Sequence, residues 1–160
     1  MRLWRIEKSL FAQEARSGNG ARIYGGRWNR PGRPAISCAG SLSLAMLEVP
    51  AQVSTEEDAG AQRVFFTVEI DDQWMEAIAA TDLPRNWRSA LNVGPGRRQG
   101  DAWLVRGHSA ALRAPSALVA GEFNGLLNPA HPHDRKAAIW SAGKPLRMDA
   151  RLFQDLGKAE

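Results

Sequence analysis

A nearly uncharged stretch, residues 34–55, restricts how this chain folds, because Glu48 is the only charged side chain in its 22 positions. A segment so poor in charge predicts burial. Its first part, residues 35–38, has the pattern of a short strand. Ser41 then has the position of an N-cap residue for a helix from Leu42 to about Val49. The stretch therefore predicts a strand and a helix in the core.

The predicted helix is apolar on almost every side. Four residues have the spacing of one buried stripe: Leu42, Ala45, Met46 and Val49. Leu44 and Leu47 lie on other faces, which predicts a central helix. Pro50 should end or kink this helix, because proline lacks the amide donor that a further turn needs.

The rest of the chain reads as short elements separated by glycine- and proline-rich segments. The most regular strand is Val64–Ile70, and a short helix is predicted from Asp71 to about Ala80. Further strands are predicted at residues 3–6, 102–107, 116–120 and 137–140. Residues 16–34 and 81–101 read as irregular. Asn128–Pro132 should be a turn, because a residue before proline avoids the helical region.

These elements alternate without a strict βαβ order, which favours an α+β fold over a doubly wound one. We expect a compact mixed or antiparallel sheet core with short helices, in a single domain of residues 1–160. No apolar run approaches the ~20 residues of a membrane span, and the charged N-terminus is unlike a secretory signal. The single cysteine, Cys38, predicts a reducing, cytoplasmic location.

Most of the basic residues are arginine, and several of these arginines are clustered in one segment. The net charge is +4, and 17 of the 21 basic residues are arginine. Five of them fall in an acid-free segment of 18 positions: Arg16, Arg22, Arg27, Arg30 and Arg33. This distribution favours an anionic partner without choosing among nucleic acid, nucleotide and acidic protein. A solvated basic loop explains the charge equally well.

Glu48 is the strongest candidate for a functional residue. A buried, unpaired carboxylate is costly or takes up a proton, so Glu48 needs a cationic or hydroxyl partner. Three interpretations stay open at this point: a salt bridge in the core, a carboxylate reaching solvent at the helix end, and a carboxylate lining a pocket.

Two arginines have contexts suited to an anion. Arg27 lies in Gly25–Asn29 (GGRWN), where glycines let a ligand approach the backbone, arginine offers a fork for phosphate and Trp28 offers a flat ring. A structural turn would explain these glycines equally well. Arg5, on the first predicted strand, either points to solvent or is held inside by an anion. Ser116 begins a predicted apolar strand and alone indicates little.

Several motifs occur in an order that resembles the RES domain family. The first half of the resemblance is carried by Gly20–Asn29 (GARIYGGRWN), Gly32–Pro34 (GRP) and Ser41–Glu48 (SLSLAMLE). The second half is carried by Ala114–Asn124 (APSALVAGEFN) and Leu126–Pro132 (LLNPAHP). The first predicted strand also matches. Together the motifs span most of the chain without a large insertion.

Known RES-domain proteins are toxins of Xre–RES toxin–antitoxin pairs, and their fold resembles that of ADP-ribosylating toxins. The resemblance therefore implies that fold here, with NAD as a substrate and no metal. It implies an Xre-type helix-turn-helix antitoxin as partner, a homodimer, and a protein target as one possible acceptor of ADP-ribose. Direct binding to nucleic acid or to a membrane is not implied.

Residue by residue, the resemblance assigns catalytic roles to Glu48, Arg27 and Ser116. It assigns NAD binding to a larger set: Arg5, Arg27, Tyr24, Trp28, Ser37 and Asn124. Ser37 stands where the family usually has a tyrosine, so a stacking surface for nicotinamide or ribose is missing there. Tyr24 or Trp28 are the candidates to replace it.

The reaction that the resemblance implies is cleavage of the nicotinamide–ribose bond, in which positive charge builds up at ribose C1′. Glu48 would bind the ribose hydroxyls and stabilise that charge. Arg27 and Arg5 would hold the pyrophosphate, and Ser116 would orient the nicotinamide amide or the ribose. Water, phosphate and a protein side chain stay open as acceptors of ADP-ribose.

Other functions fit parts of the sequence. A basic nucleic-acid-binding domain explains the arginines but not Glu48, and no recognisable signature for such a domain is present. A serine hydrolase would use Ser116, His131 and Asp134, without the usual nucleophile elbow. His131 and His133 are only two of the ligands that a metal needs. Because of Ser37, a catalytically weakened RES-like binding protein also stays open.

Overall fold

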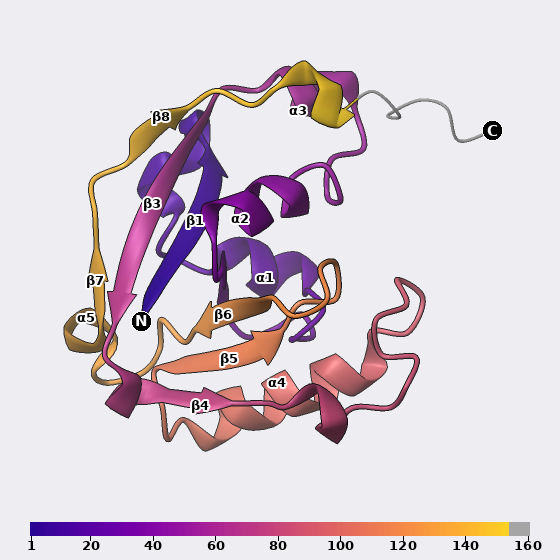
Figure 1. Cartoon of the computed structure of the whole chain (residues 1–160). Coiled ribbons are helices and arrows are strands. Elements are labelled where there is room, and N and C mark those ends of the chain that lie inside the picture. Colours follow the sequence, from indigo (N-terminus) through magenta and orange to yellow (C-terminus); the bar gives the residue numbers. More distant parts are fainter. Residues whose placement is uncertain (154–160) are drawn as a thin grey trace.

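The computed structural model describes residues 1–153 and contains one eight-stranded sheet (Figure 1). The strand order is β4-β5-β6-β2-β1-β3-β7, with β8 also paired to β3. The strands are β1 (Arg2–Lys8), β2 (Ile36–Ala39), β3 (Arg63–Ile70), β4 (Met75–Ala77), β5 (Ala111–Pro115), β6 (Phe123–Leu127), β7 (Ala138–Trp140) and β8 (Lys144–Leu146). The pair β4–β5 is parallel and the other pairs are antiparallel. The predicted domain of residues 1–160 extends beyond the described part.

The helices are short and lie around this sheet. They are α1 (Asn19–Tyr24), α2 (Leu42–Glu48), α3 (Glu56–Gly60), α4 (Gly94–Arg106) and α5 (Asp134–Ala137), with short 3-10 helices at Ser9–Glu14, Asp72–Trp74, Ala80–Asp82 and Ala150–Phe153. Figure 1 shows the sheet curling, since β1 and β3 run steeply while β4, β5 and β6 run across the molecule. The expected α+β class is confirmed. In residues 1–153 no helix has the length and apolar character to cross a bilayer.

The core has apolar clusters on both faces of the sheet, as the alternation of side chains along the strands requires. Under α4, Trp103 packs with Trp28 and Trp87 over Leu112 and Leu126. Under α2, the buried residues are Ala39, Leu44 and Ala45. The opposite face holds Leu3, Ile36, Cys38, Val68 and Leu127 among others. Burial there raises the pKa of the Cys38 thiol to about 12, so this cysteine is a neutral core residue rather than a nucleophile.

The predicted α2 helix is confirmed at both ends. Ser41 has extended backbone angles, its Oγ accepts a hydrogen bond from the Leu44 amide at 3.1 Å, and the helix ends at Glu48, shortly before Pro50. The predicted buried stripe is confirmed only at Ala45, because Leu42, Met46 and Val49 are half-buried and the other buried residue is Leu44. Leu47 is 43% exposed. The helix packs against β1 and β2 on one side only, so it lies at the surface and is not central.

A Ser41→Ala variant should be less stable than the wild-type protein by about 1 kcal/mol, because an amide at the start of α2 loses its acceptor. Thermal or urea denaturation followed by circular dichroism measures this loss. Ser43→Ala, at an exposed position of the same helix, is the matched control and should not lower stability. Equal stability of the two variants would contradict the capping role.

The largest error of the sequence reading concerns α4. Residues 81–101 were expected to be irregular and 102–107 to form a strand, yet Gly94–Arg106 is one helix. Pro95 lies in its first turn, where a missing amide hydrogen costs nothing. Gly96 and Gly100 are four residues apart and therefore lie on one face of the helix. The glycines that suggested a loop are there for close packing.

Smaller differences occur elsewhere. The predicted strand at 116–120 is wrong: the strands are β5 and β6, and residues 116–122 form the turn between them. The predicted helix at 71–80 is a single 3-10 turn followed by β4. The segment 16–34 contains α1 within otherwise irregular chain. The strands expected at 3–6, 35–38, 64–70 and 137–140 coincide with β1, β2, β3 and β7 to within two residues, and the turn at 128–132 is confirmed.

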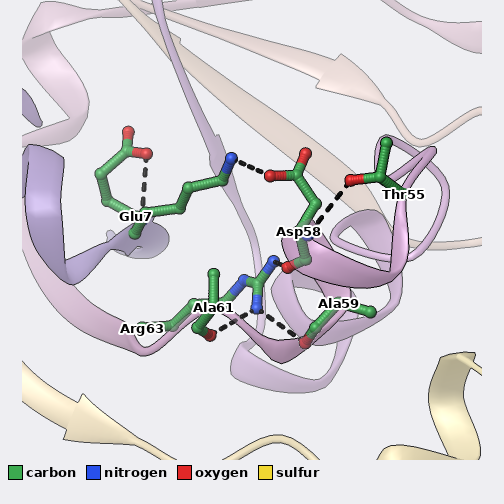
Figure 2. A network of polar contacts seen from close by, with 7 residues as sticks. Glu7, Thr55, Asp58, Ala59, Ala61 and Arg63 are labelled. Carbon is green, nitrogen blue, oxygen red and sulfur yellow. Dashed lines mark hydrogen bonds and ion pairs between the residues drawn. The ribbon is translucent and has the colours of Figure 1, made fainter.

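A separate polar cluster stabilises α3. Figure 2 shows the Arg63 guanidinium donating to the backbone carbonyls of Asp58, Ala59 and Ala61 at the end of this helix, where a cation opposes the helix dipole. The Thr55 hydroxyl caps its start by accepting from the Asp58 amide at 3.2 Å. Lys8 of β1 pairs with the Asp58 carboxylate. This buried arginine therefore has a structural role.

Candidate active site

Glu48 is the last residue of α2 and is half-buried. Its Oε1 accepts a hydrogen bond from the Asn124 side-chain amide at 3.1 Å. The partner of the lone acid is thus an amide from a residue 76 positions away, rather than the cation or hydroxyl that we expected. The carboxylate neither lies deep in the core nor projects freely into solvent.

Asn124 is on β6, inside the sheet. It pairs with Ala39 on β2 and with Ala114 on β5. Directly paired residues project from the same face of a sheet, so two short alanine side chains flank the asparagine. Asn124 can therefore reach α2 without a large neighbour beside it. The strands on both sides fix its backbone.

Arg27 is half-buried and points toward the loop before α4. Its Nη1 donates to the Trp87 carbonyl at 2.7 Å, and both terminal nitrogens reach the Ser89 carbonyl at 3.3 Å. Burial lowers the pKa of Arg27, and the negative charge of Glu48 opposes this shift. The two charges therefore lie within electrostatic reach, although no direct ion pair joins them in the described part of the chain.

The backbone around Arg27 is held by α4. The Arg97 Nε donates to the Gly26 carbonyl at 2.8 Å, and Asp101 accepts from both the amide and the guanidinium of Arg30. A Cβ atom at Gly96 would lie 2.7 Å from the Arg27 carbonyl oxygen, so only glycine allows this approach. Sequence reasoning missed these contacts. The i, i+4 spacing of two glycines was the available signal.

Ser116 follows β5 and is completely buried. Its amide donates to the Glu122 carbonyl, which continues the β5–β6 pairing by one residue. Its Oγ accepts hydrogen bonds from the amides of Leu118 and Val119 at 3.2 and 3.1 Å. The hydroxyl thus holds the turn between β5 and β6, at the same end of these strands as Asn124.

The structure gives Arg5 partners within the sheet. Its Nη1 donates to the Ser37 carbonyl at 2.8 Å, and its Nη2 pairs with Glu7 at 2.6 Å. Arg5 alternates with Trp4, which packs near α2, so the Arg5 side chain leaves the opposite face of the sheet. The structure therefore brings Glu48, Asn124 and Arg27 near one another but not Arg5.

The aromatic candidates differ in accessibility. Trp28 is 4% exposed and packs against Trp87, with ring centroids 5.8 Å apart, so its ring belongs to the core. Tyr24 is 79% exposed at the end of α1. Ser37 is exposed on β2. Tyr24 is thus the aromatic candidate whose ring is open to a ligand.

The three residues of the alternative hydrolase hypothesis do not lie together in the structure. Ser116 lies next to the start of β6, whereas His131 and Asp134 follow the end of that strand. The His131 ring packs against His133 and Trp74. Within residues 1–153 no group of three or more potential metal ligands occurs. A pocket of about 760 Å³ lies between residues 59–64 and 145–153. None of the predicted site residues is among the residues that line it.

A family model described as the RES domain matches residues 2–149. The chain belongs to the RES domain family. A protein named "Toxin Res" from Photorhabdus laumondii subsp. laumondii is 36% identical over 129 residues, covering 81% of this chain and 82% of the relative. A "Toxin Res" from Yersinia enterocolitica is 38% identical over 131 residues, covering 82% and 86%. A "Prs ADP-ribosylating toxin" from a Sphingobium species is 33% identical over 134 residues, covering 81% and 83%.

Family membership confirms the resemblance that the sequence motifs suggested. The match covers the strand that carries Arg5, the loop of Arg27, the helix of Glu48 and the turn of Ser116. The individual residue roles stay predictions.

Proposed function

We propose that this RES-domain protein is a toxin that cleaves the nicotinamide–ribose bond of NAD and passes ADP-ribose to an acceptor. The observation that carries the proposal is the Glu48 carboxylate, held by Asn124 within electrostatic reach of Arg27. Membership of the family and relatives named as toxins, one of them ADP-ribosylating, support it.

In the proposed reaction, the bond between ribose C1′ and the ring nitrogen of nicotinamide breaks. Both electrons leave with nicotinamide, which becomes neutral, and C1′ gains oxocarbenium character. The Glu48 carboxylate stabilises this positive charge and binds the ribose hydroxyls. A nucleophile then bonds to C1′ and loses its proton to solvent. Water gives ADP-ribose, phosphate gives its 1″-phosphate, and a side chain gives an ADP-ribosylated protein.

Arg27 is the residue that we assign to the pyrophosphate. The end of its guanidinium, formed by Nη1 and Nη2, binds the Ser89 carbonyl. The side edge, formed by Nε and the second Nη2 hydrogen, contacts no acceptor in residues 1–153. That edge is a two-donor fork of the kind that binds phosphate. The carbonyls fix the guanidinium so that this fork is preorganised.

The other candidates take more limited roles. Ser116 is completely buried and its Oγ accepts two amide hydrogen bonds within the turn, so we assign it to holding the turn between β5 and β6 rather than to direct contact with NAD. We assign Arg5 to the stability of the sheet, because its guanidinium joins β1 to the Ser37 carbonyl of β2. Tyr24 is the proposed stacking residue in place of the tyrosine that the family usually has at position 37.

Free nicotinamide, measured after the purified protein is mixed with NAD, tests the proposed function. Parallel reactions with buffer alone, with phosphate and with a cell extract distinguish the three acceptors by the mass of the product. We expect nicotinamide release in at least one of them. An NAD pool that stays intact in all three would contradict the proposal.

The toxin role carries a further expectation about partners. An Xre-type helix-turn-helix antitoxin should bind the protein and block its activity, and the protein should pair as a homodimer. Growth arrest after induced expression, relieved by the neighbouring open reading frame, tests the first expectation. Sedimentation analysis of the purified protein tests the second.

An Arg27→Lys variant should raise the KM for NAD about tenfold or more with a smaller change in kcat, because lysine keeps the charge but loses the fork. Steady-state kinetics of nicotinamide release measure both constants. Arg98→Lys, at an exposed position on α4, is the matched control. An unchanged KM in the Arg27 variant would show that Arg27 does not contribute to substrate binding.

A further inference from the structure

The hydrogen bond between Asn124 and Glu48 connects β6, which is held rigidly in the sheet, with α2, which is packed less tightly. Asn124 lies on β6, which has hydrogen-bonded strands on both sides. Glu48 lies at the free end of α2, a helix of which only Leu44 and Ala45 are buried. The regular helix ends at Glu48, and Val49 and Pro50 belong to the turn that follows. Packing alone therefore leaves the direction of the Glu48 carboxylate poorly defined, and the hydrogen bond from β6 defines it.

We propose that Asn124 is a positioning residue that orients the Glu48 carboxylate, rather than a residue that binds NAD. Its amide donates to Oε1 and so leaves Oε2 for the ribose hydroxyls. The flanking residues Ala39 and Ala114 have short side chains, which leave room for the Asn124 side chain to reach α2. This inference rests on the function proposed above.

The chemical type of the partner suits this role. A carboxylate that stabilises an oxocarbenium ion must keep its negative charge available. A lysine or arginine at position 124 would compete for that charge as a counterion. The neutral amide of asparagine supplies a directed donor without a positive charge. Asparagine therefore fixes the geometry of Glu48 while leaving its charge for the substrate.

The decisive test compares kcat with KM in Asn124→Ala. A residue that orients the catalytic carboxylate should lower kcat, by about ten- to a hundredfold for a lost hydrogen bond to a charged group, with little change in the KM for NAD. Asn124→Asp keeps the shape but places a second carboxylate beside Glu48, so its loss of kcat should be at least as large. Asn19→Asp, on the exposed side of α1, is the control for the added charge.

A second measurement does not depend on turnover. In a Glu48→Gln background, adding Asn124→Ala should leave the Kd for NAD, measured by calorimetry, within about twofold. A clear rise in Kd or in KM with an unchanged kcat would make Asn124 a substrate-binding residue and overturn the inference. An unchanged kcat in both Asn124 variants would also overturn it, while the proposed function would stand. If the wild-type protein releases no nicotinamide, both proposals fall.

Discussion

Glu48→Gln should release nicotinamide from NAD at least about a hundredfold more slowly than the wild-type protein, because the glutamine amide cannot stabilise a developing cation electrostatically. The fold should survive. Glutamine keeps an oxygen that accepts from Asn124, and Glu48 is only half-buried at the end of α2. Nicotinamide release and thermal unfolding, measured on the same preparation, separate the loss of activity from a loss of structure.

The matched control for this variant is Glu57→Gln, on the exposed surface of α3. It removes the same charge outside the candidate active site and should keep wild-type turnover. Full turnover in the Glu48 variant would exclude its carboxylate from the reaction, whatever the family relationship suggests.

A Gly100→Ala variant should be strongly destabilised. A Cβ atom at this position would lie 1.7 Å from the Trp28 carbonyl oxygen, a distance that no side-chain rearrangement relieves. Either α4 or the loop of residues 25–30 must move, at a cost of about 3 kcal/mol or more. The melting temperature should then fall by about 6–12 °C. Because the same loop carries Arg27, the KM for NAD should rise as well.

Gly20→Ala is the control for the glycine substitution. Its Cβ would meet nothing within 4 Å, and its place in α1 favours alanine. Differential scanning calorimetry should show an equal or higher melting temperature for this variant. If Gly100→Ala melts at the wild-type temperature, the close contact between α4 and the Arg27 loop is not tight in solution.

The sequence predicted best those elements whose signals are local. The α2 helix could be located because Ser41 is a good N-cap, Pro50 stops a helix and the residues between them are apolar. The strand β3 was visible from the alternation of its apolar residues. By contrast, α4 was missed because Gly96 and Gly100 are poor helix formers. Their value lies in contact with the Arg27–Trp28 backbone, which is tertiary information.

The same limit applies to the candidate active site. The isolation of Glu48 indicated that it needs a partner, but no local pattern could identify Asn124, 76 positions away on another strand. The alternation of β1 could not decide which face receives Arg5, since both neighbours are apolar. Only the pairing with Glu7 and the Ser37 carbonyl shows its environment. Arg27 was found from its motif, whereas its carbonyl partners lie 60 and 62 positions further along the chain.

The outermost strands of the sheet, β4 on one side and β7 and β8 on the other, are only three residues long each. A border this short exposes few backbone donors and acceptors, which protects a sheet against joining with the sheet of another molecule. Two copies of this protein therefore have little opportunity to merge into a continuous sheet. Association between copies should depend on side chains of helices and loops, and single surface substitutions should be able to break it.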